Sequence, residues 1–191
     1  MLPTPDPDRK KQHYADGFWR EETIYALAAV RAAAAPKSWA IRDRLRRLTY
    51  QQFVEAADAL AGDLRRNGLQ PGDRVAIWLP SRVETAVAIL ACARNGYVCS
   101  PGLQRDHTVE QVLDLLQRMS ASALILEPGY GADANRRDIS PGLDVLASLK
   151  TVYSLPPLEK CNDRTPYGLT EPDRATAEND PDSVVYLPFT S

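Results

Sequence analysis

The sequence is poor in the residue types that build metal centres and disulfide frameworks. Its 191 residues include only three cysteines and two histidines. Cys92, Cys99 and Cys161 form no CxxC pair, and neither His13 nor His107 is spaced from a cysteine as a metal ligand would be. An odd number of thiols outside a metal motif fits a reducing compartment. We therefore expect a cytoplasmic protein without a metal site, whose cysteines act as small core hydrophobes.

Long hydrophobic runs and an excess of charge of either sign are also lacking. The longest apolar stretches, 75–79 and 86–93, fall far short of the roughly 20 residues that cross a bilayer, so we expect no membrane span. The N-terminal text MLPTPDPDRKK lacks the apolar region of an export signal. The 23 basic and 25 acidic side chains nearly cancel, and no basic patch of the kind that binds nucleic acid is visible. We expect a soluble protein without a nucleic-acid partner.

Self-contained catalytic motifs are absent as well. No GxGxxG follows a predicted strand, and the sequence has no Walker loop, no GxSxG elbow and no HExxH. Acidic residues fall mainly on the outer faces of predicted helices, so their spacing nominates no acid–base pair. We expect His107 to be a surface or capping-region residue before a helix. The residues taken alone therefore predict a scaffold.

A strand, a helix and a second strand occupy residues 68–105. The run 74–79 is rich in β-branched and aromatic types and is followed by a proline, which is typical of a buried strand. Ser81 is expected to cap the next helix, with Glu84 three positions later completing a capping box. A second strand is predicted at 97–99. A crossover of this length joins parallel strands, almost always right-handedly.

Similar elements alternate along the rest of the chain. Thr49 with Gln52, and Thr108 with Gln111, have the spacing of capping boxes at the start of amphipathic helices. Further elements are expected as helices at 8–15, 24–35 and 143–149, a hairpin over 39–48, and strands at 123–126, 151–153 and 182–187. Strands that alternate with helices predict an α/β fold with a mostly parallel, doubly wound sheet flanked by helices.

Three peripheral features complete the expected organisation. Residues 1–36 form a leading helical segment, in which Phe18 and Trp19 present apolar surface and Trp19 is expected to anchor the segment to the main body. Residues 154–183 are expected to be a proline-rich surface loop. Four arginines are expected to form a solvated edge of the hairpin, without a partner: Arg42, Arg44, Arg46 and Arg47.

Four segments occur in the order found in one known family. They are Leu48–Phe53 (LTYQQF), Gly68–Ile77 (GLQPGDRVAI), Leu79-Pro80 with Leu90–Val98, and Val184–Ser191 (VVYLPFTS). These resemble the motifs LTYxEL, GLxxGDRVAI, LPN with LAxxxxGxV, and YxxFTSGTTGxPKG of adenylate-forming (AMP-binding) enzymes. That superfamily contains acyl- and aryl-CoA synthetases, peptide-synthetase adenylation domains and luciferases. The resemblance is closest to bacterial medium-chain or cyclohexanecarboxylate-type CoA ligases.

The resemblance implies a parent enzyme of which residues 1–191 are the N-terminal part of the AMP-binding domain. Thr190 and Ser191 correspond to the first two hydroxyl residues of the loop that cradles the phosphates of ATP. No catalytic or metal-ligating residue can be carried over. The parent is expected to use ATP, Mg²⁺ and CoA with a small-molecule carboxylic acid. Its oligomeric state, including a homodimer, stays open, as does the identity of the acid.

Two alternatives remain beside a carboxylate–CoA ligase. One is an aryl-acid adenylating ligase for peptide synthesis, which passes the acid to a carrier-protein thiol instead of CoA. The other is a stand-alone, non-catalytic α/β module that binds a partner through Phe18 and Trp19. In either case residues 1–191 are expected to be inactive by themselves, because the glycines and lysine of the phosphate loop and the acid pocket are absent.

Overall fold

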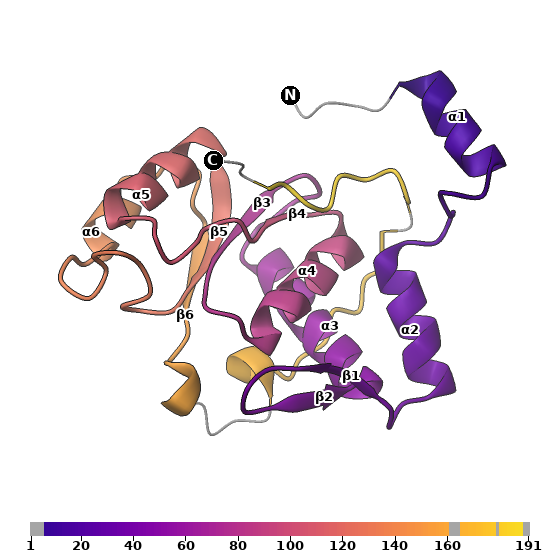
Figure 1. Ribbon diagram of the computed structural model, residues 1–191, viewed down its shortest axis with the longest axis horizontal. Coiled ribbons are helices and arrows are strands. Elements are labelled where there is room, and N and C mark those ends of the chain that lie inside the picture. The colour runs from indigo at the N-terminus through magenta and orange to yellow at the C-terminus, as the bar shows by residue number, and fades with distance from the viewer. Residues whose placement is uncertain (1–5, 161–164, 179, 189–191) are drawn as a thin grey trace.

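A four-stranded parallel sheet lies at the centre of the computed structural model, which describes residues 6–160, 165–178 and 180–188 (Figure 1). The strand order is β4-β3-β5-β6, and every neighbouring pair is parallel. The strands are β3 (Arg74–Trp78), β4 (Val98–Ser100), β5 (Ala121–Leu126) and β6 (Thr151–Ser154). The predicted parallel sheet is confirmed.

Helices cover both faces of this sheet (Figure 1). The helices are α1 (Pro7–Ala15), α2 (Ile24–Ala34), α3 (Tyr50–Arg66), α4 (Val83–Asn95), α5 (Val109–Arg118) and α6 (Ser140–Leu143). On β3, Val75 and Ile77 join a core with α3 and α4, whereas Ala76 and Trp78 join a second core with α5 and α6. Alternate residues therefore point to opposite helical layers, and the predicted doubly wound α/β architecture is confirmed.

An antiparallel hairpin and two short 3₁₀ helices complete the described structure. The hairpin consists of β1 (Trp39–Arg42) and β2 (Arg47–Thr49), as predicted. The 3₁₀ helices span Leu158–Lys160 and Pro166–Gly168. Among the described helices, none has the length and apolar character that a membrane span requires.

Both predicted capping boxes are confirmed. The Thr49 hydroxyl accepts from the Gln52 backbone N–H at 3.3 Å, and the Gln52 side chain accepts from the Thr49 N–H at 2.9 Å. Thr108 and Gln111 make the same reciprocal pair at 3.3 and 2.8 Å. These two helices begin where local sequence requires, because each box satisfies backbone N–H groups that the first turn leaves unpaired.

The predicted capping box of α4 is wrong. Arg82, not Ser81, occupies the N-cap position and makes no capping hydrogen bond through its side chain. The Val83 N–H instead donates to Asp43, a carboxylate from the tip of the hairpin, at 3.2 Å. Glu84 turns to two arginines rather than back to the helix start. A distant negative charge thus serves the positive end of the helix dipole, which sequence spacing does not reveal.

Two other predicted elements differ from the structure. The helix expected at 143–149 is a single turn, Ser140–Leu143, which begins next to a proline suited to the first helical turn. The strand expected at 182–187 is reduced to one parallel bridge between Tyr186 and Cys99 of β4. Cys92 and Cys99 are fully buried free thiols, as expected of core hydrophobes, and Cys161 lies outside the described residues.

Within the leading segment, α2 packs Tyr25 and Ala28 against the core, whereas polar contacts connect α1 to the rest of the chain. The Trp19 ring packs on His13 and Tyr14 of α1, at centroid distances of 5.1 and 5.7 Å, and is 37% exposed. Tyr14 donates a hydrogen bond to Asp182 at 3.0 Å, and Lys10 forms an ion pair with the same carboxylate. Trp19 therefore stabilises the turn after α1, while Asp182 connects α1 to the C-terminal part of the chain.

The proline-rich segment is pinned to the helical layer at Asp173. Its side chain is fully buried and forms ion pairs with Arg65 and, at 3.4 Å, with Arg94. The Asp173 backbone N–H donates to the carbonyl of Asp58 on α3 at 2.9 Å. This backbone passes so close to α3 that a Cβ on Gly62 would lie 2.9 Å from the Asp173 nitrogen. Only glycine fits at position 62 without displacing the segment.

We predict that Gly62→Ala destabilises the chain by about 1–3 kcal/mol, because the added methyl group must push backbone atoms aside. In an exposed helix interior the same change gains roughly 1 kcal/mol. Urea unfolding at an unchanged m-value measures the difference. Gln51→Ala at an exposed position of α3 is the control and should stay within about 0.5 kcal/mol of the parent. A stabilised Gly62→Ala chain would contradict the close approach of Asp173.

Candidate functional site

The strand order places a crevice between the carboxyl ends of β3 and β5. The chain runs from β3 to β4 on one side, then crosses to β5 on the other side of β3, so the winding direction reverses at this point. Ligands of open α/β sheets bind in the crevice that such a reversal leaves. A hollow of about 670 Å³ lies at this position. It is lined by Arg42, Asp43, Arg44, Pro80, Ser81, Arg105, Glu127, Pro128, Gly129, Tyr130, Leu158 and Glu159.

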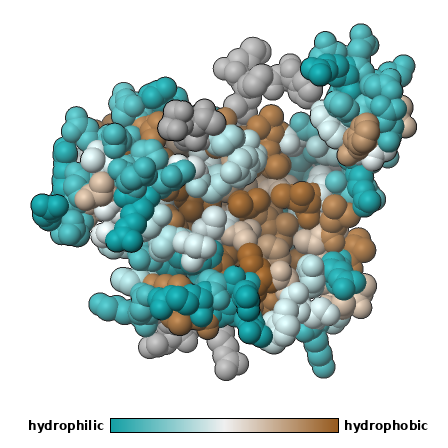
Figure 2. All heavy atoms as spheres, in the orientation of Figure 1, coloured by the Kyte–Doolittle hydropathy of each residue, from teal (hydrophilic) through white to brown (hydrophobic). Residues whose placement is uncertain are grey.

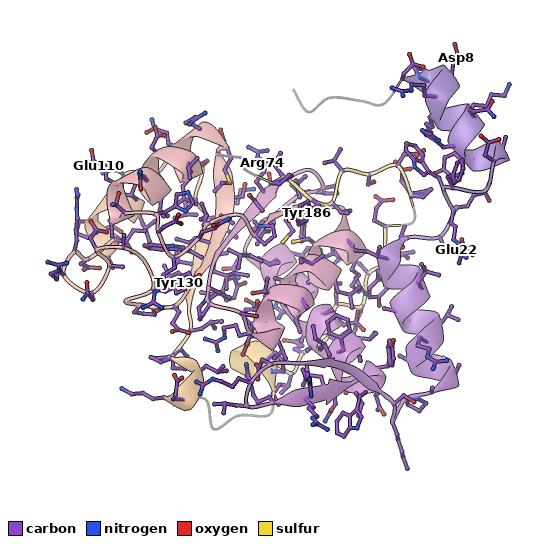
Figure 3. All side chains as sticks on the ribbon, viewed as in Figure 1. Asp8, Glu22, Arg74, Glu110, Tyr130 and Tyr186 are labelled. Atoms are coloured by element: carbon purple, nitrogen blue, oxygen red, sulfur yellow. The ribbon has the colours of Figure 1, made fainter. Side chains whose placement is uncertain are left out.

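The lining of this hollow is strongly charged, with both signs present. Arg44 and Glu159 form an exposed ion pair between the hairpin and the first 3₁₀ helix. Tyr130, labelled in Figure 3, follows β5, and its ring meets Trp78 edge-on at a centroid distance of 6.4 Å. The Trp78 indole donates to the carbonyl of Gln104 at 3.0 Å. Tyr130 of the lining is therefore backed by Trp78, a buried residue at the end of β3.

A series of ion pairs with alternating charges connects the side chains next to the hollow. Arg46 donates to both carboxylate oxygens of Glu84 at 2.6 and 2.7 Å and to Asp43 at 2.8 Å. Arg82 donates to the same Glu84 at 2.9 and 3.1 Å, and to Glu127 at 2.8 Å. The side chains of Arg82 and Glu84 are 1% and 2% exposed. Buried charges are tolerated only when paired and hydrogen-bonded, and each of these five meets that condition.

In this series of ion pairs, the pKa values of the two glutamates, Glu84 and Glu127, are shifted in opposite directions. Burial is the largest influence on both and acts to raise the pKa. At Glu84, hydrogen bonds and charges from Arg46 and Arg82 outweigh burial, and the pKa is lowered. At Glu127, Arg82 alone opposes burial while Glu159 and Glu84 add repulsion, so the pKa is raised. Glu127 is thus held less firmly in its charged form than Glu84 is.

The segment before the predicted phosphate loop runs along β4. Cys99 donates its N–H to Val185 and accepts from the N–H of Leu187, both at 2.9 Å, and the Ser100 hydroxyl donates to Leu187 at 2.8 Å. Since the pairing is parallel, this segment advances towards the edge where β3 and β5 end. Tyr186, labelled in Figure 3, is 51% exposed between these contacts.

Thr190 and Ser191, the site residues predicted from sequence, lie outside the described residues, so their role stays a prediction. The sequence did not single out Arg82 or Glu127. The expectation that the hairpin arginines form a solvated edge is wrong for Arg46, whose side chain is 12% exposed between two carboxylates. The one signal for Glu127 was its place directly after the apolar strand β5, because its partners are far away in sequence.

A second hollow, of about 840 Å³, opens at the start of α5. His107 lies there and its Nδ1 accepts from the Gln104 N–H at 2.9 Å, which confirms the expected capping-region role. The charged lining is mainly acidic, with Asp106, Glu110 and Asp114 against one arginine. Within the described residues, no group of three or more histidine, cysteine or acidic side chains is arranged to hold a metal ion. The hollow between β3 and β5 is the better candidate for an anionic ligand.

Comparison with known proteins identifies the family. A family model described as AMP-binding enzyme matches residues 28–191, which is most of the chain. The chain therefore belongs to the AMP-binding enzyme family. The resemblance noted in the sequence motifs is confirmed.

Two curated relatives illustrate the range of similarity. A salicylyl-CoA synthase / salicylate adenylyltransferase from Streptomyces sp is 36% identical over 93 residues, covering 48% of this chain and 17% of the relative. A 2-hydroxy-7-methoxy-5-methyl-1-naphthoate–CoA ligase from Streptomyces carzinostaticus is 28% identical over 130 residues, covering 68% and 23%. The chain spans 12–23% of the length of the curated relatives it matches.

A solved structure supports the fold. The N-terminal domain of FACL13 from Mycobacterium tuberculosis superposes with a TM-score of 0.62 at 20% identity. The match covers 81% of this chain and 38% of that domain. At this identity the likeness establishes the fold, which is that of the N-terminal part of an adenylate-forming enzyme.

We predict that Glu84→Gln destabilises the chain by about 3–5 kcal/mol, because it removes the negative charge shared by two buried arginines. Chemical denaturation at neutral pH measures the effect. Glu110→Gln on α5 removes a carboxylate whose side chain is 79% exposed, so it serves as the matched control and should change little. Equal stabilities of the two variants would contradict the paired burial of Glu84.

The lowered pKa values of Asp43 and Glu84 predict acid sensitivity. A carboxylate whose folded pKa lies below its unfolded value stabilises the fold above the unfolded pKa, and that stability is lost as pH falls through the folded pKa. The free energy of unfolding should therefore fall below about pH 4, the ordinary carboxyl range. Urea titrations from pH 3 to 7 test this, and the slope should be smaller in Glu84→Gln. An identical slope would refute the assignment.

Proposed function

We propose that the chain is the N-terminal part of an ATP-dependent carboxylate–CoA ligase. The observation that carries the proposal is the family match over residues 28–191, and the names of the relatives, a salicylyl-CoA synthase and a naphthoate–CoA ligase, support it. In the parent, a carboxylate oxygen attacks the α-phosphorus of ATP and pyrophosphate leaves, which gives an acyl-adenylate. The thiol sulfur of CoA then attacks the acyl carbon, and AMP leaves with the bonding electrons.

Thr190 and Ser191 are proposed to begin the loop that holds the ATP phosphates. Their hydroxyls and backbone N–H groups would donate to phosphate oxygens, and Mg²⁺ would neutralise part of the phosphate charge. The parallel course of residues 184–187 beside β4 supports this role, because a segment that runs in this direction advances towards the carboxyl edge of the sheet. Catalytic and metal-binding groups are proposed to come from segments other than residues 1–191.

A second candidate is an aryl-acid adenylating ligase that passes its acid to a carrier-protein thiol. The name of the Streptomyces relative, which includes salicylate adenylyltransferase, favours an aryl acid. The choice between CoA and a carrier protein is decided by which thiol discharges the adenylate. For either ligase we propose a cytoplasmic location, with fatty acid metabolism as the setting if the acid is aliphatic.

A non-catalytic module that uses the Phe18 and Trp19 surface is the third candidate. Phe18 is 75% exposed, which such a role requires. An intact mass from the native host equal to that of residues 1–191 would favour the module. A reading frame that continues past Ser191 into a glycine- and threonine-rich loop ending in Pro-Lys-Gly is expected for the ligase, and any other continuation would refute it.

We predict that purified residues 1–191 release no pyrophosphate from ATP and Mg²⁺ in the presence of salicylate or acetate. Electrostatic positioning of the phosphates supplies much of this catalysis, and the groups that provide it are absent. A coupled pyrophosphate assay measures the rate against a protein-free control. A rate that exceeds the control and depends on the acid would show that the chain is a complete catalyst.

In the parent enzyme, Thr190→Val should raise the KM for ATP about 10- to 100-fold. The substitution removes one hydrogen bond to a charged group, which is worth roughly 1.5–3 kcal/mol. Steady-state kinetics at saturating acid measure KM, and Thr176→Val at an exposed position is the matched control. An unchanged KM for ATP would remove Thr190 from the phosphate site.

A further inference from the structure

Two asparagines in the sequence are followed directly by glycine, Asn67 by Gly68 and Asn95 by Gly96. Asparagine is a thermolabile residue, because the backbone nitrogen of the next residue can bond to the carbon of its side-chain amide. A following glycine favours this reaction, since it has no side chain to obstruct the approach and its backbone is the most adaptable. Each pair is therefore a chemical candidate for spontaneous deamidation, and its surroundings decide whether the reaction occurs.

Asn67 and Gly68 lie at the exposed end of α3. Asn67 is the C-cap residue, and the four consecutive residues 65–68 are all exposed. The Asn67 side-chain amide donates to Asp63, to its backbone carbonyl at 2.9 Å and to its carboxylate at 3.2 Å. The Gly68 N–H donates to the Arg65 carbonyl at 2.9 Å. These contacts lie within the last helical turn, so fraying of that turn releases the amide and the backbone nitrogen together.

Asn95 and Gly96 have the same sequence in a protected setting. Gly96 is buried, and the Asn95 side-chain amide donates to the Ala61 carbonyl at 3.1 Å and to the buried Asp173 carboxylate at 2.9 Å. Figure 2 shows hydrophobic residues at the centre of the view, where Figure 1 places α4, the helix that ends at Asn95. Freeing this amide would break contacts that join α3, α4 and the proline-rich segment. Asn95 is therefore held away from the reaction while the chain is folded.

We propose that Asn67 is a site of spontaneous deamidation in the folded chain and that Asn95 is protected from it. The Gly68 nitrogen bonds to the side-chain carbonyl carbon of Asn67. The carbon–nitrogen bond of the side-chain amide breaks, and ammonia leaves with the proton that the Gly68 nitrogen gives up. Water then opens the resulting cyclic imide at either carbonyl, which restores the N–H and leaves aspartate or isoaspartate. The net change is one amide and one water converted to a carboxylic acid and ammonia, with no oxidant or reductant.

Deamidation places a carboxylate where an amide now caps α3. A negative charge at a helix C-terminus opposes the helix dipole, and this charge would lie beside Asp63, four residues earlier. Asp63 accepts from the Tyr153 hydroxyl of β6 at 2.7 Å and pairs with Arg66 at 3.2 Å. Repulsion between the two carboxylates therefore acts on a contact between α3 and the edge of the sheet. Isoaspartate also adds a methylene group to the backbone just before the buried Leu69, so the modified chain is less stable.

Ageing of the full 191-residue chain in mildly alkaline buffer, followed by peptide mass spectrometry, tests the proposal. In the folded chain, conversion at Asn67 should exceed conversion at Asn95 by about tenfold or more. In urea the two pairs should convert at similar rates, because folding is what distinguishes them. Asn67→Gln is the conservative variant, which keeps an amide but needs a larger ring to react. Ageing should lower the urea midpoint of the parent chain and leave that of Asn67→Gln unchanged.

Each other outcome overturns the proposal. Equal conversion of Asn67 and Asn95 in the folded chain would show that the contacts of Asn95 give no protection. An Asn67 that stays unmodified while the chain in urea is converted would show that the end of α3 does not open. Equal losses of stability on ageing in the parent and in Asn67→Gln would assign the loss to another site. Because ATP and acid are omitted, failure here leaves the proposed ligase function to its own tests.

Discussion

The pairing of Glu84 with two arginines is the interaction on which the arrangement around the candidate site depends. Three buried side chains, Arg46, Glu84 and Arg82, would each be costly alone, and together they join the hairpin to the start of α4. Through Arg82 the same pairing reaches Glu127 at the end of β5 and the carbonyl of Pro156 after β6. Loops from four separate parts of the chain are fixed by one requirement, that no buried charge be left unpaired.

This requirement also shapes the chemistry of the hollow. Arg82 donates two hydrogen bonds to Glu84 and one to Glu127, and Glu84 also accepts two from Arg46. Burial raises the pKa of Glu127, and the nearby charges of Glu159 and Glu84 add to the effect while Arg82 opposes it. Among Asp43, Glu84 and Glu127, the carboxylates of this series of ion pairs, Glu127 is therefore the one whose charged form is stabilised least. The pKa of Glu127 at the edge of the sheet thus depends partly on Arg82 and Glu84, which do not themselves line the hollow.

Local signals were sufficient for much of the fold. The apolar run of β3 and the box of Thr49 with Gln52 depend on residues a few positions apart, and the structure has both. The start of α4 could not be predicted, because Asp43 lies 40 residues from the Val83 N–H that it accepts. The candidate hollow could not be predicted for the same reason, because the residues that line it come from loops far apart in the sequence. Family motifs supplied the prediction that Thr190 and Ser191 belong to a phosphate loop, which physical patterning alone did not suggest.

The contacts of Asp182 link the two ends of the described chain, so a truncation at the N-terminus affects the segment near the C-terminus. Lys10 and Tyr14 near one end meet this carboxylate just before the segment that pairs with β4 near the other. A hydrogen bond and an ion pair at the surface thus connect the two ends, and these partly exposed polar contacts contribute little stability. Removing the first turns of α1 would leave the hydrophobic cores intact, but it would remove the contacts that hold the chain just before Val185. Helix α1 thus connects one end of the chain to the segment that forms the bridge with β4 at the other.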